Sequence, residues 1–373
     1  GVYASVFFRA GKDYMTATSN LIDQEKMAVI IQEVVGEQYR DCYFPNFSGV
    51  GRSLNYYPLG NEQPEDGVAE VAIGLGKYIV DGGVGLRFSP LHPGRVLQTS
   101  TLDLALKQTQ TRLCALPVDA SACGTITTDD SYNIVSRPVQ DFANTGALRY
   151  IASTYDARDA ILKDYEDGSG RRVITFNNIL RDKVFPLAPA IDFMLKQGQS
   201  AMQRPVEIEF AGLIAPNASS VPVNKGHIYW LQIRPIIDRK ELVTDAMLEV
   251  DPASVILRSS TAIGNGAVEG IRDIVYVRPD TFDSANNNRL VGLIEAINRR
   301  YVLVGPGRWG SSDSALGIPV RWADISGARL IAEAAVGSYC PEPSQGTHFF
   351  HNLTSFGVGY FTIAPGIDGA VYN

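Results

Sequence analysis

The sequence is poor in the residues that build metal centres and disulfides. Its 373 residues include only 4 histidines and 4 cysteines. Two of the histidines, His348 and His351, could share a helical face, but their flanking residues do not favour a metal site. No CxxC pair occurs, so we expect free thiols in a reducing compartment. The cysteines are Cys42, Cys114, Cys123 and Cys340.

Long apolar runs and basic clusters are also missing. No stretch approaches the roughly 20 apolar residues that span a bilayer, and no signal peptide is recognisable. The 33 Lys and Arg are outnumbered by 40 Asp and Glu, giving a net charge of −7. Phosphate backbones require clustered basic side chains. We therefore expect a cytoplasmic protein whose partners are neither membranes nor nucleic acids, and we leave homo-oligomerisation open.

What is present is the composition of a globular protein, with 45% hydrophobic and 20% charged residues. The length suits two or three domains. Because the sequence changes character after Arg239, we predict a boundary near residue 240. The fold class expected is α/β (α+β), with a mixed or antiparallel sheet in residues 1–240 and a smaller β-rich domain of unassigned role in residues 241–373.

Hydrophobic periodicity predicts the individual elements. The chain opens on Gly1 and runs at once into a pattern of helical period, which predicts a helix over 1–20 and suggests a piece of a longer chain. Further helices are predicted over 101–116, part of 140–164, 188–201, 289–300 and 325–335. Strands are predicted over 25–35, the start of 67–83, 206–214, 227–237, 273–279, 301–307, 317–322 and 357–365.

The segments 206–214 and 227–237 are predicted to form a β-hairpin with a long loop. Alternate residues of a strand share a face, so Glu207 and Glu209 lie on one face of the first strand. Gln232 and Arg234 share a face of the second. If the strands pair, two carboxylates, one amide and one guanidinium meet on one surface.

Two interpretations of this surface follow from the residues. Carboxylates beside an amide oxygen make a hard oxygen site suited to Mg²⁺, and a neighbouring arginine can hold a phosphate oxygen. The alternative is a surface strand pair with cross-strand salt bridges, each worth about 0.2–1 kcal/mol. Geometry alone favours neither.

The motifs VEIEFA and IYWLQIRP resemble the end of the nucleotide-binding, ATP-grasp domain of the phosphoenolpyruvate synthase and pyruvate phosphate dikinase family. The resemblance implies that ATP and Mg²⁺ bind here. It assigns Glu209 and Gln232 to metal and phosphates, Glu207 as an additional metal-binding acid, and Arg234 to the phosphoryl groups. Glu209 and Arg234 are the catalytic residues it implies.

Earlier segments resemble the same family in the same order. KMAVIIQEVVG (26–36) is similar to its adenine-facing hinge strand, which implies nucleotide contacts from Gln32, Glu33 and Val35. FSGVGRSLN is similar to a segment whose hydroxyl and amide fall on Ser53 and Asn55. VAEVAIGLGKYIV resembles the stretch that carries a glutamate, here Glu70. The chain departs from the family at Lys77, where an acid is usual.

The resemblance implies transfer of a phosphoryl group from ATP to a protein histidine and then to pyruvate. The family's first subdomain, swivelling histidine domain and pyruvate barrel are not recognisable in this sequence. We therefore expect a fragment that is inactive alone. A non-catalytic nucleotide-binding module and a related dikinase with another acceptor remain alternatives.

The glycine-rich segment GPGRWG (305–310) matches the spacing of a dinucleotide-binding loop. Its context does not fit, because Pro319 would soon break the helix that should follow. We favour structural glycines, with an anion-binding turn at Arg308 as the alternative. Thr347-His348 lacks the flanks of the family's phosphorylated histidine.

Overall fold

The computed structural model describes the chain in segments. They are residues 28–56, 58–119, 133–164, 170–214, 226–236, 250–259, 262–263, 268–278, 282–283, 286–297, 299–311, 316–334, 358–363 and 371–372. The helix predicted over 1–20 and the motif around His348 lie outside them. Two compact units are present, a first unit of Ile31–Ile236 and a second formed mainly by Ile237–Asn373. The predicted domain boundary near residue 240 stays a prediction.

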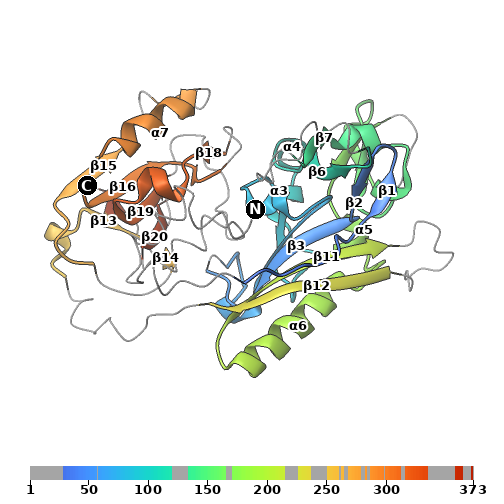
Figure 1. Ribbon diagram of the computed structural model, residues 1–373, viewed down its shortest axis with the longest axis horizontal. Coiled ribbons are helices and arrows are strands. Elements are labelled where there is room, and N and C mark those ends of the chain that lie inside the picture. Colours follow the sequence, from blue (N-terminus) through green and yellow to red (C-terminus); the bar gives the residue numbers. More distant parts are fainter. Residues whose placement is uncertain are drawn as a thin grey trace. The chain divides into compact units, whose positions relative to one another are not determined.

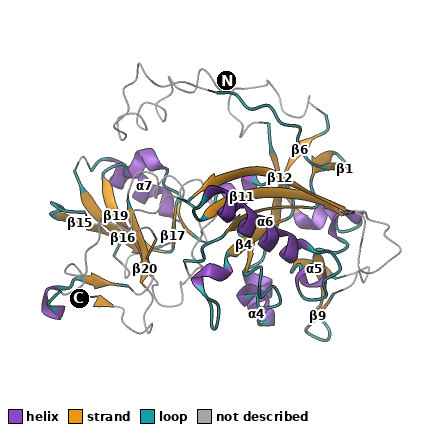
Figure 2. Ribbon diagram, turned by 90° about the horizontal axis from the view of Figure 1, so that it is seen from below, coloured by secondary structure: helices purple, strands orange, loops and turns teal. Residues whose placement is uncertain are grey.

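A five-stranded antiparallel sheet forms the centre of the first unit (Figure 1). Its strands, in spatial order, are β12 (Gly226–Pro235), β11 (Val206–Ile214), β3 (Phe47–Arg52), β4 (Val68–Ala72) and β5 (Leu86–Phe88). The predicted hairpin is β11 and β12, whose residues pair in antiparallel register. Helix α6 (Leu187–Met202) lies along β11 and β12 in both ribbon views (Figure 2).

The sheet has one apolar and one polar face. Val206, Ile208 and Phe210 of β11 join the hydrophobic core together with Ile191 and Leu195 of α6. Gly49 of β3 is required here, because a Cβ at this position would lie 2.4 Å from the Phe210 ring. Alternation therefore turns Glu207 and Glu209 to the opposite face.

Smaller elements surround the central sheet of the first unit. One further sheet contains β1 (Glu37–Tyr39), β2 (Cys42–Phe44), β6 (Arg112–Pro117) and β7 (Val135–Pro138). Another contains β8 (Ala152–Asp156), β9 (Ile161–Lys163) and β10 (Arg171–Ile174). The helices are α3 (Lys77–Val80), α4 (Leu102–Lys107) and α5 (Asn177–Leu180). The 3₁₀ turns are Pro64–Asp66, Leu97–Thr99, Val139–Phe142 and Gly146–Leu148.

The second unit has a mostly parallel sheet. Its strands, in spatial order, are β14 (Ala262–Ile263), β20 (Gly359–Ile363), β19 (Ala328–Ala334), β16 (Tyr301–Pro306) and β15 (Asp273–Tyr276). Only β14 runs antiparallel to its neighbour. Helix α7 (Asn287–Glu295) connects β15 to β16. Short elements complete the unit, namely β13 (Leu257–Arg258), β17 (Arg308–Trp309), β18 (Gly317–Ile318), β21 (Val371–Tyr372) and the 3₁₀ turns Pro252–Ser254 and Trp322–Ile325.

The expected α+β class with an antiparallel sheet is confirmed, whereas several predicted elements are wrong. The predicted strand over 25–35 has no regular structure in its described residues, where Ile30 and Ile31 are exposed. The predicted helix over 325–335 is instead strand β19, an inner strand whose apolar run cannot be told from a buried helix by period alone. The predicted helices over 101–116 and 140–164 contain α4 and two 3₁₀ turns, followed in each case by strands.

No described helix is both long and apolar enough to cross a membrane.

A buried carboxyl group lies in the parallel sheet of the second unit. Glu333 of β19 accepts hydrogen bonds from the Tyr360 hydroxyl and, at 3.3 Å, from the backbone N–H of Trp309. Burial raises the pKa of Glu333 from 4.5 to about 7, although Tyr360 and the nearby Arg308 favour its charged form. Gly307 and Gly310 have positive φ around this turn, which supports the structural interpretation of GPGRWG.

The raised pKa makes the second unit sensitive to pH. The neutral form of Glu333 stabilises the fold fully below pH 4.5, and the stabilisation is lost as pH rises through 7. The free energy of unfolding should fall by ~3 kcal/mol from this group between pH 5 and 9. Glu333→Gln should remove that dependence. The free energy of unfolding at each pH is measured by urea unfolding, followed by the fluorescence of Trp309 in a protein whose Trp230 and Trp322 are replaced by phenylalanine. An equally steep pH dependence in Glu333→Gln would show that Glu333 is not the responsible group.

Candidate functional site

The polar face of the central sheet brings the predicted site residues into two neighbouring rows. Directly paired residues lie on one face, so the register defines the rows. The first row contains Gln232, Glu209, Val50, Glu70 and Arg87. The second row contains Arg234, Glu207, Arg52 and Val68. The four residues predicted to meet across the hairpin are therefore neighbours.

Glu207 is the buried centre of an ionic cluster. Its side chain is 3% exposed and lies between two guanidinium groups. Arg52 Nε donates to Oε2 at 2.5 Å, and Arg234 Nε donates to Oε1 at 2.7 Å. Both carboxylate oxygens thus accept charge-assisted hydrogen bonds. We call Arg52, Glu207 and Arg234 the arginine clamp.

Glu209 lies two residues further along β11 and has different hydrogen bonding. Its Oε1 atom is buried and has no hydrogen-bond partner, and the nearest guanidinium nitrogen is Arg234 Nη2 at 3.5 Å. The side chain as a whole is 22% exposed. A carboxylate oxygen without a hydrogen bond is costly when buried. Glu209 is therefore the acid of this face that is ready to accept a cation.

Gln232 lies opposite Glu209 and is exposed. The register shifts just beyond this pair, so that Phe210 faces Trp230 and Leu231 is an extra residue of β12. This bulge lets Gln232 stay on the polar face while Trp230 packs against the core, with its ring centroid 6.1 Å from that of Phe210.

The segment similar to the family's hinge lies against the same strand. Gln32 Nε2 donates to the carbonyl of Leu231, the bulged residue, at 3.1 Å. The Tyr43 hydroxyl donates to the carbonyl of Val34 at 3.2 Å. Glu33 is exposed and Val35 is half-buried. Gln32 thus lies beside the residue that precedes Gln232, although the segment does not form the predicted strand.

Glu70 lies on the polar face, in the same row as Glu209. One of its oxygens accepts from the backbone N–H of Gly85 at 3.1 Å. A Cβ at residue 85 would lie 2.4 Å from the Glu70 side chain, so this close approach requires glycine. The geometry places Glu70 beside Arg87, its partner on β5.

Ser53 and Asn55 are buried at the end of β3. The Ser53 hydroxyl accepts from the backbone N–H of Val206 at 2.9 Å. Asn55 donates to Glu62 at 3.1 Å and accepts from Arg87 at 2.8 Å. Both side chains hold neighbouring parts of the sheet together, and the nucleotide contact expected of Ser53 stays a prediction.

Lys77, the departure from the family, is the first residue of α3. Its ammonium pairs with Asp81 at 2.9 Å, and its side chain is 31% exposed. Ile79 of the same helix packs on Val50 and Ala72 of the polar face. The helix thereby closes the end of this face away from Glu207.

Arg52 and Arg87 are site residues that the sequence interpretation missed. Ser48, Val50 and Arg52 alternate in FSGVGR, so the sequence already placed Arg52 on one face of its strand. The pairing of β3 with β11 decided that this was the face of Glu207. That pairing joins residues 155 positions apart and leaves no local signal.

Within the described residues, no three His, Cys, Asp or Glu side chains gather as metal ligands. A cation on this face would need amide and substrate oxygens as well, which is the ligand set that suits Mg²⁺. The predicted metal ligands, Glu207, Glu209 and Gln232, include one such amide, and the metal site stays a prediction.

Comparison with known proteins shows the family of the chain. The sequence profile described as the AMP/ATP-binding domain of pyruvate phosphate dikinase matches residues 1–255. No individually curated protein matches the chain. The profile match covers more than half of the 373 residues, including every element of the polar face. The chain therefore belongs to the family of pyruvate phosphate dikinase AMP/ATP-binding domains and carries the nucleotide-binding part of a phosphotransferase of that type.

Proposed function

We propose that the polar face of the central sheet binds ATP with Mg²⁺ in a phosphotransferase that acts like phosphoenolpyruvate synthase. In this reaction ATP phosphorylates a protein histidine, which passes the phosphoryl group to pyruvate. The observation that supports the proposal most is the buried Glu209 oxygen without a hydrogen bond, next to an arginine whose position is fixed. No other acid of the two rows combines these features.

Glu209 and Gln232 would hold the metal ion. They face each other across the hairpin and present one anionic and one neutral oxygen ligand. Glu207 was predicted as a third ligand, but both of its oxygens already accept from arginines, so we assign it to the clamp instead. When bound, Mg²⁺ would neutralise phosphate charge and leave coordination positions for phosphate oxygens.

Arg234 would stabilise the phosphoryl group during transfer. Its Nε and Nη2 atoms contact Glu207, whereas Nη1 takes part in neither hydrogen bond. The side chain is 20% exposed, so its neighbours do not cover it completely. Positioned charge supplies most of phosphoryl-transfer catalysis. The clamp would serve this purpose by holding Arg234 in place before ATP arrives.

The hinge segment would seat the adenine ring. Gln32 donates to the carbonyl of Leu231, the residue before Gln232, and would hold the hinge segment near the metal ligands. The Val34 carbonyl is already bonded to Tyr43, which leaves the backbone groups of Glu33 and Val35 for the adenine edge. Glu70 and Ser53 keep their predicted nucleotide roles within this proposal.

A nucleotide-binding module without turnover is the second candidate. Lys77 favours it, since the family usually has an acid there and this lysine instead pairs with Asp81. A related dikinase with another acceptor is a third candidate, because no residue that the structure describes identifies a pyruvate pocket.

Phosphoryl transfer from labelled ATP distinguishes the three candidate functions. The full-length protein is incubated with Mg²⁺ and ATP carrying ³²P in the β-phosphate, and then with pyruvate. We expect label on a histidine and its transfer to pyruvate. Nucleotide binding without label would favour the module, and label that passes only to another acceptor would favour the related dikinase.

Arg234→Lys should keep ATP affinity within about threefold but slow labelling by about 100-fold, because lysine cannot form the paired guanidinium contacts.

A further inference from the structure

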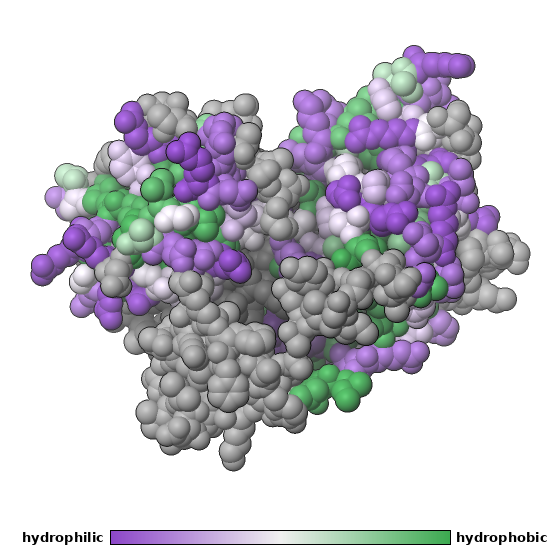
Figure 3. All heavy atoms as spheres, turned by 45° about the horizontal axis from the view of Figure 1, so that its top comes forward, coloured by the Kyte–Doolittle hydropathy of each residue, from purple (hydrophilic) through white to green (hydrophobic). Residues whose placement is uncertain are grey.

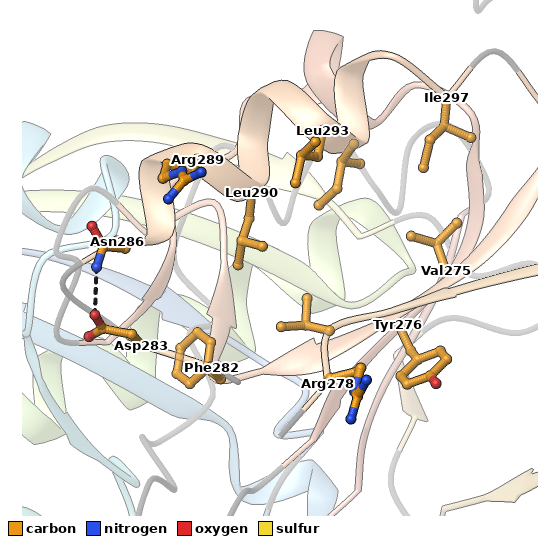
Figure 4. A pocket seen from close by; sticks show the side chains of 12 residues that line it. Val275, Tyr276, Arg278, Phe282, Asp283, Asn286, Arg289, Leu290, Leu293 and Ile297 are labelled. Atoms are coloured by element: carbon orange, nitrogen blue, oxygen red, sulfur yellow. Dashed lines mark hydrogen bonds between the residues drawn. The ribbon is translucent and has the colours of Figure 1, made fainter. Parts of the chain in front are cut away.

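The second unit contains a cavity of about 560 Å³ between strand β15 and helix α7 (Figure 4). All its lining residues lie between Val275 and Ile297. β15 is the edge strand of the parallel sheet, and the cavity begins where this strand ends. Open parallel sheets characteristically bind ligands beyond the carboxyl ends of their strands. The volume is within the range of sites for small molecules.

The walls of the cavity are largely apolar. Leu290, Leu293, Ile294 and Ile297 follow the spacing of one helical face on α7 and at its end. Val275 and Phe282 face them from the strand side (Figure 4). Leu293 is 68% exposed although it lines the cavity. Figure 3 shows hydrophobic surface of the second unit gathered at the left of the view.

The polar groups of the cavity carry a net positive charge. Arg278 and Arg289 supply two cations, and Asp283 supplies one carboxylate. Asn286 donates to this carboxylate at 2.6 Å (Figure 4). Arg289 lies at the first turn of α7, is exposed, and forms no ion pair within the part of the chain that the structure describes. An apolar cavity with an uncompensated guanidinium at its rim suits an amphipathic anion.

We propose that this cavity binds a small molecule with an aromatic or branched aliphatic body and a single anionic group. The body would pack between Leu290, Leu293 and Phe282, and the anion would lie at Arg289. One guanidinium without an ion pair, that of Arg289, is too little charge to neutralise a triphosphate. The ligand class therefore differs from the nucleotide assigned to the first unit, and the inference does not depend on that assignment.

The aromatic sulfonate 8-anilinonaphthalene-1-sulfonate is a suitable probe, because it has an apolar body and one anionic group and its fluorescence reports binding. Titration of the whole chain in saturating Mg-ATP keeps the first unit occupied. We expect one saturable site. Arg289→Glu and Leu293→Glu should each weaken binding at least tenfold. Leu293 is exposed, so its replacement should leave the fold intact, as circular dichroism can verify.

Arg258→Glu is the matched control, since Arg258 is an exposed arginine of the second unit that does not line the cavity. It should bind the probe like the original protein. Unchanged affinity in both Arg289→Glu and Leu293→Glu would overturn the proposal. Loss of all probe binding on addition of Mg-ATP would overturn it as well, by assigning the probe to the first unit.

Discussion

Replacing Glu209 with glutamine is expected to lower the Mg²⁺-dependent affinity for ATP by about 100-fold or more, because an amide cannot supply the anionic ligand that the buried Oε1 atom offers. The change preserves the size of the side chain. The ion pair that it removes is long, at 3.5 Å to Arg234, and the Glu209 side chain is 22% exposed, so the stability of the fold should change by about 1 kcal/mol or less. Isothermal titration with ATP in the presence and absence of Mg²⁺ measures the effect.

The matched control for this variant is Glu65→Gln. Glu65 is exposed in the 3₁₀ turn Pro64–Asp66, away from the two polar rows. Its replacement changes the net charge by the same amount and should leave affinity within about twofold, since long-range surface electrostatics is screened by salt. If Glu209→Gln binds Mg-ATP as tightly as the control does, Glu209 is not a metal ligand.

Removing the acid of the arginine clamp should have the largest effect on stability. Glu207→Ala leaves Arg52 and Arg234 without their shared carboxylate, and Arg52 is 5% exposed. Breaking a buried ionic cluster from one side costs about 3–5 kcal/mol. Arg52→Met should cost less, because Glu207 keeps Arg234 and the methionine stem packs in similar space. We expect the double variant to be more stable than the sum of the two losses predicts.

Urea unfolding of the first unit measures these losses. The chain has 3 tryptophans, and Trp230 in the hairpin strand β12 reports on this unit when Trp309 and Trp322 are replaced by phenylalanine. Strict additivity of the two single losses would show that Arg52 and Glu207 are not coupled, contrary to the clamp.

The clamp also links stability to the proposed function. If Arg52 holds Arg234 through Glu207, Arg52→Met should slow histidine labelling although Arg52 itself does not touch the phosphates. Conservative replacement by lysine should restore part of the rate, since an ammonium can still pair with the buried carboxylate. This effect would separate a positioning role from packing alone.

Local sequence was sufficient for elements whose pattern has one interpretation. The hairpin was predicted within two residues at each end, and α6 within one, since strict alternation and a long helical stripe are strong signals. The shared face of Glu207 and Glu209, and that of Gln232 and Arg234, follow from the same alternation, whereas their pairing was decided by the register of the strands. The β-bulge after Glu209 was not predictable, because it depends on how Trp230 packs in the core.

The wrong elements share a physical cause. Residues 328–334 have the sequence ARLIAEA, whose short apolar stretches fit a helix or a buried strand equally, and the neighbouring strands β16 and β20 decided between them. Residues 28–35 are as apolar as a strand, but within the described chain they have no sheet to join. Whether an apolar segment becomes a buried strand depends on which other strands lie next to it in the fold.

The sequence by itself determined which side chains share a face of each strand, because the period of two is a local property of the extended backbone. It therefore determined which polar residues of the hairpin can meet on one surface and the family to which they point. Only the tertiary structure decided that Arg52 completes the cluster around Glu207, that Glu209 keeps an oxygen without a hydrogen bond, and that a cavity opens beside α7. These features arise where distant segments pack together, and packing between them is set by the whole fold.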